Sequence, residues 1–335
     1  MVVILSMVTF RSVERLGRDL FSRVLESSLS VPYRSLVLVD DSPTPETAEV
    51  VKSFAESRGK ELVVLRSRLY GGATRHTRAT ARQTAVDAFL ENFTEEWLMF
   101  LDDDFVLGSG YWAEASAHLA DPSVGEVWGV NWDAHPERRV FIGLLHRARL
   151  TRTSYAGFLV EGFQRRGGTH DTLYRRQAVS GVLIPPELHV YEDAWLHHYV
   201  RCRGWESRVV YDSGLHYSPA GDLPLEEEKR SLLEAVRIAV KYGIAGDAHV
   251  LETLSSGGST TRWILGWLGL ARPVLGLPFQ AVASYRQERS VPRAVARALR
   301  RQYLKAWIRY VVLREARRIR GRVPDVCEVV LSHAK

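Results

Sequence analysis

Hydrophobic residues in the N-terminal half of the chain recur in two alternating patterns. Short, nearly continuous apolar runs are typical of strands that are covered on both faces of a sheet. Between them lie stretches with apolar residues three and four positions apart, which is the spacing of amphipathic helices. This alternation predicts an α/β fold with a largely parallel sheet. Strands are predicted at residues 2–8, 35–39, 61–65 and 97–101, and helices at 13–29, from about Glu46 onward, and at 75–93.

The fourth apolar run ends in three consecutive carboxylates, Asp102, Asp103 and Asp104. Adjacent carboxylates repel one another, so a cation or hydrogen-bond donors would stabilise them. Open α/β sheets bind their ligands at the carboxyl ends of the strands. We therefore expect Asp102 and Asp104 to reach a divalent metal ion that itself holds phosphate oxygens. A solvated acidic turn is the alternative interpretation.

A second acidic strand end is predicted at Asp40-Asp41, which Ser42 and Pro43 follow. In a parallel sheet this end would lie beside the acidic triplet. A carboxylate in that position can accept a hydrogen bond from the ring N–H of a nucleobase. The simpler explanation is local, because Asp, Ser and Pro all favour turns.

Paired glycines, Gly71 and Gly72, precede the helix predicted at 75–93. Such a pair lets backbone N–H groups approach an anion at a helix N-terminus. Arg75, Arg78 and Arg82 are spaced by three and four, so they would form one basic stripe on that helix. Beside an acidic metal site, the stripe is suited to offset the charge of a diphosphate. Arginine stripes also occur on ordinary solvated helix faces.

These segments together resemble the inverting GT-A glycosyltransferases, in particular the family 2 type. The resemblance implies an α/β fold of the GT-A class, that of nucleotide-diphospho-sugar transferases, with a Rossmann-like mixed sheet. Members of the family commonly carry Asn where this chain has Gln83. The resemblance spans the first two thirds of the chain and rests on the strand at 2–8, Val39-Asp40-Asp41-Ser42, Gly71-Gly72, Ala81-Arg82-Gln83 and Phe100-Leu101-Asp102-Asp103-Asp104.

The resemblance also implies which residues bind a nucleotide-sugar, either a UDP-sugar or a GDP-sugar. Matching segments of the family contact the base, the ribose and the diphosphate of the donor. Carried onto this sequence, the predicted donor contacts are Thr9, Asp41, Arg78, Arg82, Asp102 and Asp103.

Two further features of the family pattern are present. By the resemblance, Asp193 is the catalytic base, and Glu192 orients it or the acceptor. His216 resembles the third metal contact, beside Asp104 and Asp102. Because one ligand is an imidazole, Mn²⁺ would be favoured somewhat over Mg²⁺. The alternatives are that Glu192 and Asp193 only favour the helix dipole and that His216 is structural.

Residues 134–180 are rich in glycine and arginine. We expect this region to shape the acceptor side, with an acceptor that carries phosphate or another anion. A solvated basic surface is an equally simple interpretation. The arginines are Arg138, Arg139, Arg147, Arg149, Arg152, Arg165, Arg166, Arg175 and Arg176.

The C-terminal third is predicted to be helical, which divides the chain into a catalytic domain at 1–222 and a helical region at 223–335. Residues 263–285 are strongly apolar, but prolines interrupt them, so core packing and membrane-surface contact both remain open. Farther on, two stripes recur every fourth residue on opposite faces of one predicted helix, as in helices that lie on membranes. The basic stripe is Arg293, Arg297, Arg301, Lys305 and Arg309, and the apolar stripe is Val295, Leu299, Tyr303, Trp307 and Val311. The alternative is that the apolar stripe packs on the catalytic domain.

Charge and cysteine content narrow the class of protein further. Residues 286–322 hold thirteen Lys or Arg against two acids, a balance of +11, whereas the whole chain carries +6. The body is therefore mildly acidic, and nucleic acid is not an expected partner. Cys202 and Cys327 are too few and too isolated for a disulfide framework, and residues 1–10 lack the form of a signal peptide. We expect a protein of the reducing cytoplasm, with the basic helix on the inner face of the membrane.

The predicted function is that of an inverting, metal-dependent glycosyltransferase that moves a hexosyl group onto a hydroxyl or phosphate of a glycan or lipid-linked acceptor. One rival is a nucleotidyltransferase that makes sugar nucleotides. That class normally has a Gly-rich basic loop directly after the first strand, where this chain reads Thr9-Phe10-Arg11-Ser12. The other rival is a non-catalytic protein that binds RNA or anionic lipid through its basic tail.

Overall fold

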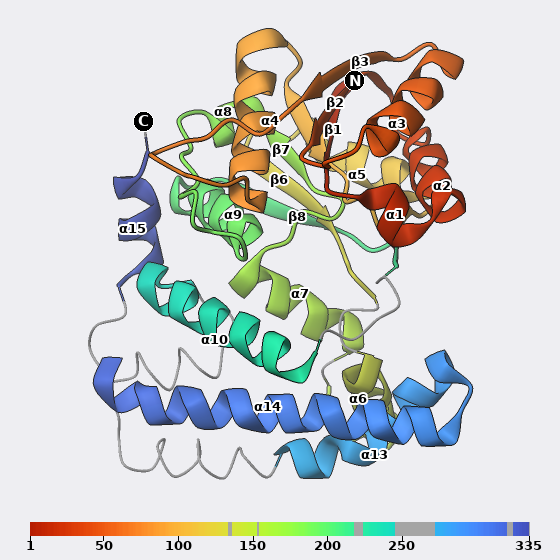
Figure 1. The fold of residues 1–335 in the computed structure, drawn as a ribbon, viewed down its shortest axis with the longest axis vertical. Coiled ribbons are helices and arrows are strands. Elements are labelled where there is room, and N and C mark those ends of the chain that lie inside the picture. Colours follow the sequence, from red (N-terminus) through yellow and green to blue (C-terminus); the bar gives the residue numbers. More distant parts are fainter. Residues whose placement is uncertain (133–135, 153, 218–223, 245–271, 320–323, 335) are drawn as a thin grey trace. The chain divides into compact units, whose positions relative to one another are not determined.

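The computed structural model describes residues 1–132, 136–152, 154–217, 224–244, 272–319 and 324–334 (Figure 1). The chain forms two compact units. The first comprises Met1–Asn131, Arg166–Gly221 and Cys327–Lys335, and the second comprises Trp132–Arg165 and Asp222–Val326.

A seven-stranded sheet organises the first unit, in the order β3-β2-β1-β4-β7-β6-β8. All neighbouring strands are parallel except β7, which is antiparallel to both β4 and β6. The sheet is therefore mixed, as predicted. Its strands are β1 (Val3–Thr9), β2 (Tyr33–Asp40), β3 (Glu61–Leu65), β4 (Trp97–Phe100), β6 (Val124–Gly129), β7 (Leu173–Arg175) and β8 (Glu206–Val210). A separate antiparallel pair joins β5 (Phe105–Leu107) to β9 (Gly214–His216).

One face of the sheet is covered by helices from the first part of the chain. Alternate strand residues such as Leu5, Leu38 and Met99 form one buried cluster with Phe21, Val24 and other apolar residues of these helices. The predicted helix at 13–29 is in fact two, because the chain turns at Gly17 with φ of 80°. The helices are α1 (Ser12–Leu16), α2 (Arg18–Ser28), α3 (Glu46–Ser57) and α5 (Tyr111–Leu119).

Helices α4 (Arg78–Asn92) and α9 (Glu192–Cys202) pack on the sheet outside that cluster and contact each other. Strand residues that alternate with the first set, such as Ile4, Val37 and Phe100, are buried as well. Since successive side chains of a strand point to opposite faces, α4 and α9 cover the second face. Helix α4 is buried from Ala79 through Phe89 and contacts β1 and β2, so it is held firmly on the sheet.

The second unit is helical. Helix α13 packs side by side with α14 (Figure 1) and also against α6, where the rings of Phe141 and Phe279 meet at 5.1 Å. The described helices include none that is both long enough and apolar enough to cross a membrane. Part of the apolar stretch predicted at 263–285 lies outside the described residues. The helices are α6 (Pro136–Arg147), α7 (Tyr155–Arg166), α10 (Leu225–Tyr242), α13 (Arg272–Glu288) and α14 (Val291–Ile319).

The two cysteines, which the sequence indicated were too few and too isolated for a disulfide framework, do form one disulfide. Cys202, the last residue of α9, forms a disulfide with Cys327 in α15 (Val326–Ser332). The two residues are 125 positions apart, so no local spacing could reveal the pair. It forms because the chain returns from the second unit to the first at residue 327. The inference of a reducing compartment rested on unpaired cysteines and loses that support.

Two arginines of the region predicted to shape the acceptor side have structural partners instead. Arg175 donates to the carbonyl oxygens of Val124 and Asp121, and Arg176 donates to those of Glu95 and Phe93. Their guanidinium groups also lie over the rings of Trp97 and Phe89. Both side chains therefore connect backbone segments of the fold, and their guanidinium groups are engaged by backbone carbonyls rather than directed toward an acceptor substrate.

The disulfide should stabilise the folded chain by several kcal/mol. Closing a loop of this length restricts the unfolded ensemble, and the expected loss on reduction is about 4 kcal/mol in the free energy of unfolding. Denaturant titration with and without reductant measures the loss for the wild type. The matched control is the Cys202→Ser/Cys327→Ser variant, whose stability must not respond to reductant. Two free thiols in the unreduced, unfolded protein would contradict the pairing.

Candidate active site

The carboxyl ends of β2 and β4 flank the end of β1, so the two acidic segments are separated by one strand rather than adjacent. Thr9 is the last residue of β1 and pairs in register with Asp40. Its hydroxyl donates to Asp40 Oδ1 at 2.9 Å, and the Ser42 hydroxyl donates to the same oxygen at 2.5 Å. Asp40 therefore stabilises the turn that leads to Asp41. Thr9 is buried at the end of β1, between the ends of β2 and β4.

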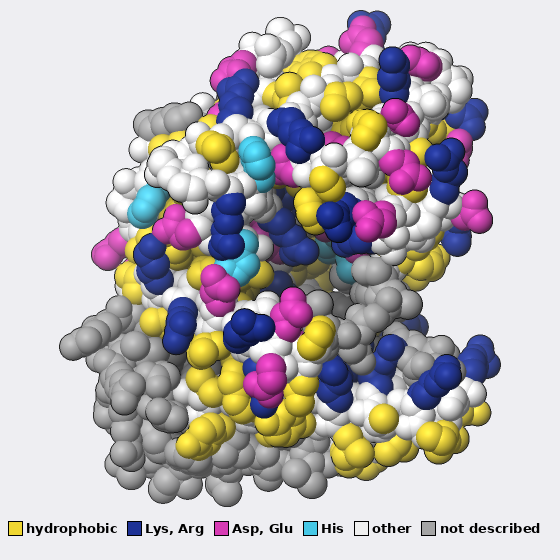
Figure 2. All heavy atoms as spheres, in the orientation of Figure 1, with side chains coloured by type: hydrophobic (Ala, Val, Ile, Leu, Met, Phe, Trp, Pro, Cys, Tyr) yellow, Lys and Arg dark blue, Asp and Glu magenta, His cyan; other side chains and the backbone are white. Residues whose placement is uncertain are grey.

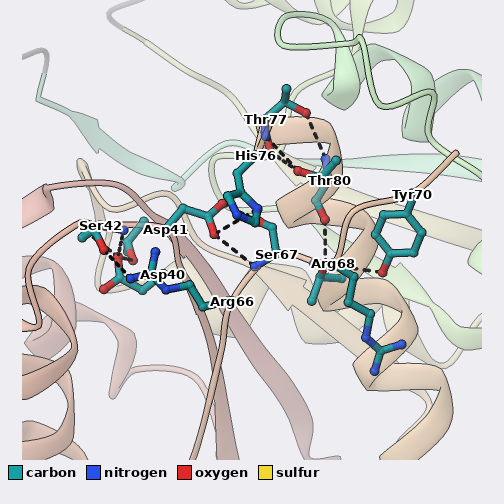
Figure 3. Close-up of polar contacts among 12 residues, drawn as sticks. Asp40, Asp41, Ser42, Arg66, Ser67, Arg68, Tyr70, His76, Thr77 and Thr80 are labelled. Carbon is teal, nitrogen blue, oxygen red and sulfur yellow. Dashed lines mark hydrogen bonds and ion pairs between the residues drawn. The ribbon is translucent and has the colours of Figure 1, made fainter. Parts of the chain in front are cut away.

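Asp41 lies at the centre of the polar cluster drawn in Figure 3. Its Oδ1 accepts a hydrogen bond from the Ser67 backbone N–H at 3.0 Å, and its Oδ2 accepts one from the Ser67 hydroxyl at 2.5 Å. The ring of His76 approaches Oδ1 to 3.8 Å. Two fixed donors thus orient this carboxylate at the end of β2.

The glycine pair does not sit at the helix N-terminus as predicted. Gly71 and Gly72 have φ of 56° and 77°, conformations suited to glycine, but α4 begins only at Arg78. The cap is Thr77, whose hydroxyl accepts from the Thr80 N–H while the Thr80 hydroxyl accepts from the Thr77 N–H. The start of α4 is thus capped by its own side chains, and the glycines shape the preceding loop.

The three aspartates after β4 point to three different partners. Asp102 forms an ion pair with Arg82 of α4. Asp103 accepts hydrogen bonds from Ser12 and from Arg15, the latter at 2.7 Å. Asp104 approaches His216 Nε2 with its Oδ1 at 3.1 Å. The carboxylates therefore do not share one ligand in this arrangement.

Asp103 is directed toward α1. Burial raises its pKa, and Arg15 and the Ser12 hydroxyl oppose the rise without cancelling it. Because its side chain is only 10% exposed and already has two donors, it fixes the turn after β4 against α1. Its part in donor binding stays a prediction.

Asp104 and His216 are brought together by the β5–β9 pair, in which Phe105 lies opposite His216. Burial alone would lower the pKa of His216, but its hydrogen bond with Asp104 and the charges of Asp104, Asp102 and Asp103 raise it. The imidazole therefore lies in the negative field of all three aspartates, although sequence positions 104 and 216 are far apart.

Arg82 is the positive centre of the site. It is 5% exposed, and its guanidinium lies 4.6 Å from the ring centre of Phe100. Burial alone would lower its pKa, but Asp102, Glu192 and Asp193 raise it. Arg82 therefore joins the acidic end of β4 to the acidic start of α9. Its Nε and Nη1 are buried and find no hydrogen-bond partner among the described residues.

Glu192 and Asp193 open α9, directly after Tyr191, which adopts a left-handed φ of 69°. Such a conformation is uncommon for a tyrosine and is held by its surroundings. Glu192 is 5% exposed, whereas Asp193 is partly exposed and accepts from the Ala194 N–H at 2.8 Å. Burial and the charge of Asp193 raise the pKa of Glu192 to about 7, against the opposing charges of Arg78 and Arg82.

A fully buried pair holds α9 on the sheet. His197, one turn after Asp193, contacts Glu126 Oε2 of β6 at 2.7 Å, and the Ser207 hydroxyl donates to the same oxygen at 2.6 Å. The backbone of α9 is also approached closely at Gly167, where an added Cβ would lie 2.6 Å from His197 Cβ. The position of Asp193 is therefore set by contacts deep in the sheet.

Three residues of this site were not found from the sequence. Ser67 orients Asp41, and nothing in its sequence context marks it. The carbonyl of His170 accepts from the Asp102 N–H at 2.9 Å, and its ring lies against Phe105. Gln83, noted only as a departure from Asn, donates to Asp87 and Val182 O and accepts from the Ile184 N–H. A buried polar residue next to Arg82 was the available signal for Gln83.

The chemistry of the donor set fits a divalent cation in part. Two adjacent ligands of an octahedral Mg²⁺ or Mn²⁺ ion at roughly 2.1 Å from the metal lie about 3 Å apart, which matches the 3.1 Å between Asp104 and His216. Within the described part of the chain, no group of three His, Cys, Asp or Glu side chains is arranged to hold a metal. Asp104 and His216 could thus supply two ligands of an ion, while Asp102 faces Arg82.

The mixed seven-stranded sheet, with helices on both faces and acidic side chains at the ends of β2 and β4, has the architecture of the GT-A class. The sequence matches glycosyl transferase family 2 over residues 8–179. The chain belongs to that family and is a glycosyltransferase. This assignment favours the predicted enzyme over the nucleotidyltransferase and the non-catalytic binder.

One solved structure shares the fold at low sequence identity, and two others show a weaker similarity. A mannosyltransferase from Pyrobaculum calidifontis, in complex with GDP-Man and Mn²⁺, superposes with a TM-score of 0.51 and 18% identity over 96% of this chain and 88% of that chain. Glucosyl-3-phosphoglycerate synthase from Mycobacterium tuberculosis has a TM-score of 0.47 and 14% identity, over 73% and 80% of the two chains. TarS from S. aureus has a TM-score of 0.46 and 16% identity, over 95% of this chain and 92% of that chain. No curated protein matches the sequence.

The raised pKa of Glu192 predicts a pH-dependent stability. An exposed glutamate titrates near 4.5, so between that value and about pH 7 the folded chain binds a proton that the unfolded chain has released. The free energy of unfolding should therefore fall as pH rises through this range, by at most about 1.4 kcal/mol per pH unit from this group.

Denaturant titrations of wild type and Glu192→Gln from pH 5 to pH 8 test this. The variant cannot ionise, so its stability relative to wild type should increase with pH. Glu49→Gln, on the exposed side of α3, is the control and should follow the wild-type curve. Parallel curves for wild type and Glu192→Gln would show that Glu192 titrates like an exposed carboxylate.

Proposed function

We propose that this glycosyltransferase is inverting and metal-dependent, and that it moves a sugar from a nucleoside-diphosphate donor to a hydroxyl or phosphate of a second substrate. In a single displacement the acceptor oxygen attacks the anomeric carbon while the bond to the diphosphate breaks. The acceptor loses its proton to a base, and the diphosphate leaves with the bonding electrons.

The burial of Arg82, with two nitrogens that find no partner among the described residues, is the observation that supports this proposal most strongly. Leaving the Nε and Nη1 nitrogens of this buried guanidinium without a partner in the described part of the chain is costly unless a ligand supplies acceptors. Diphosphate oxygens match the fork of an arginine and would satisfy both groups. Arg82 also interacts electrostatically with Asp102, Glu192 and Asp193. A diphosphate bound to Arg82 would therefore lie between the acidic end of β4 and the acidic start of α9.

Asp193 is suited to the role of base. It is less buried than Glu192, so an acceptor can reach it, and its orientation is fixed by the Ala194 N–H. Glu192 carries a raised pKa and is protonated over part of the physiological range. A neutral Glu192 can donate a hydrogen bond to the acceptor, while ionised Asp193 accepts the proton.

Asp104 and His216 would hold the cation, with Asp102 joining them if Arg82 turns to the diphosphate. When bound, the cation supplies positive charge where the leaving diphosphate becomes more negative. Mn²⁺ suits the mixed oxygen and nitrogen ligands better than Mg²⁺ does. Asp41, oriented by Ser67, would accept an N–H of the base, and UDP-sugars and GDP-sugars both offer one.

Replacing Asp193 by Asn should abolish turnover but spare donor binding. Asn keeps the shape and cannot take a proton, so the rate should fall by at least about a hundredfold. A thermal-shift screen of UDP-sugars and GDP-sugars with and without Mn²⁺ identifies the donor. Release of nucleoside diphosphate from that donor then measures turnover. Asp19→Asn, an exposed change on α2, is the control. Wild-type turnover in Asp193→Asn would remove Asp193 from its role.

Replacing Arg82 by Lys should weaken nucleoside-diphosphate binding. Lysine keeps the charge but loses the planar fork, and we expect an increase in Kd of roughly tenfold to a hundredfold. Isothermal titration with UDP and GDP in the presence of Mn²⁺ measures this. Arg201→Lys, on the exposed end of α9, should bind like wild type. Equal affinities for wild type and Arg82→Lys would place the diphosphate elsewhere.

A further inference from the structure

The first part of the apolar stripe of α14, which the sequence left free to pack on the catalytic domain or to lie on a membrane, is exposed. Val295, Leu299 and Tyr303 are 42%, 51% and 46% exposed. They follow one another at intervals of four residues, so they form a continuous line along one face of the helix. An ordinary core helix would bury this line.

The face of α14 that is buried consists of different residues. Ala294 and Ala298 are almost fully buried, and so is Gln302 one turn farther on. Across from them α13 contributes Gln280 and Ser284, and Gly276 lies close enough that an added Cβ would be 3.5 Å from the Gln302 amide. Small and polar side chains, together with Leu304, therefore line the buried side of α14, and Val295, Leu299 and Tyr303 lie outside it.

Helix α13 adds a second line of exposed apolar residues. Leu275, Val282 and Tyr285 are 71%, 48% and 47% exposed, and their spacing of seven and three places them on one face. Figure 2 shows hydrophobic side chains along the margin formed by α13 and α14, with Lys and Arg side chains next to them. Scattered apolar residues are normal on a surface, but two aligned rows on neighbouring helices indicate an interaction surface.

The charge of α14 points to the chemistry of the partner. Its 29 residues, Val291–Ile319, contain nine Lys or Arg and one Glu. One of these cations, Arg300, pairs with Glu228 of α10 at 2.6 Å, and Arg293 at the start of the helix is exposed. A partner for this surface must therefore offer an apolar region to the exposed apolar rows and negative charge to the cations of α14.

We propose that the pair α13–α14 lies on an anionic lipid bilayer. The exposed apolar rows enter the boundary between headgroups and acyl chains, and the cations of α14, such as the exposed Arg293, add attraction to the negatively charged surface. Tyr285 is suited to this boundary, since it combines an apolar ring with a polar hydroxyl. Tyr303 lies at the edge of its row, where Lys229 of α10 is 5.0 Å from its ring centre. The helix lies in the plane of the surface, as amphipathic cationic helices do. This binding is independent of the glycosyl-transfer proposal.

A lipid surface fits better than a second copy of the chain. Two copies that met through this surface would bring two strongly cationic helices together, and the like charges would repel. A bilayer instead offers many phosphates at variable positions, which suits cations distributed along the whole helix.

Vesicle flotation of the full-length chain tests the proposal. The probes are vesicles of phosphatidylcholine alone and of equal parts phosphatidylcholine and phosphatidylglycerol. We expect binding only to the anionic vesicles, and loss of that binding at high salt. The Val295→Ser/Leu299→Ser/Tyr303→Ser variant should bind at least about tenfold less, and so should Arg293→Glu/Arg301→Glu. Leu331→Ser, an exposed apolar change on α15 in the first unit, should bind like wild type.

Unchanged melting temperatures and unchanged donor binding establish that the variants are folded. Several results would overturn the proposal: no binding of wild type to anionic vesicles, equal binding to both kinds of vesicle, or undiminished binding of the triple variant. A dimer in light scattering that the triple variant abolishes, without vesicle binding, would assign the surface to a second copy instead.

Discussion

The ion pair between the buried Arg82 and the partly exposed Asp102 is the interaction on which the candidate site depends. A guanidinium inside a protein requires compensating negative charge, and here the end of β4 and the start of α9 both supply it. Helix α4 can carry Arg82 to this position only because most of the helix is buried against the sheet. The acids of β4 and α9 are separated by about ninety residues of sequence, and one arginine places them in the same electrostatic environment.

Much of the fold could be predicted from the sequence, because strands and helices are determined largely by neighbouring residues. Continuous apolar runs gave β1, β2, β3 and β4 nearly at their observed bounds, and the alternation with amphipathic helices gave the α/β class. The strand ends were also predicted correctly as the location of acidic side chains. These features need only the periodicity of a strand or helix, which neighbouring residues determine.

The features that the sequence could not reveal depend on contacts between distant segments. Nothing near Cys202 indicates that Cys327 returns to it, and nothing near Arg175 or Arg176 shows that backbone carbonyls surround them. The separate directions of Asp102, Asp103 and Asp104 depend on α4, α1 and β9 in turn. The apolar stripe of α14 was visible in the sequence, but only packing decides which face of a helix is covered.

The disulfide between Cys202 and Cys327 makes the intervening chain a covalent ring rather than a free tail. Most of the helical second unit belongs to this ring, because it continues from residue 222 to residue 326. A single break of the backbone inside the ring would leave both fragments joined, so they would remain at a high effective concentration and could re-associate. A proteolytic cut between α10 and α14 would thus leave the C-terminal helices attached to the rest of the molecule, whereas in a linear protein it would release them.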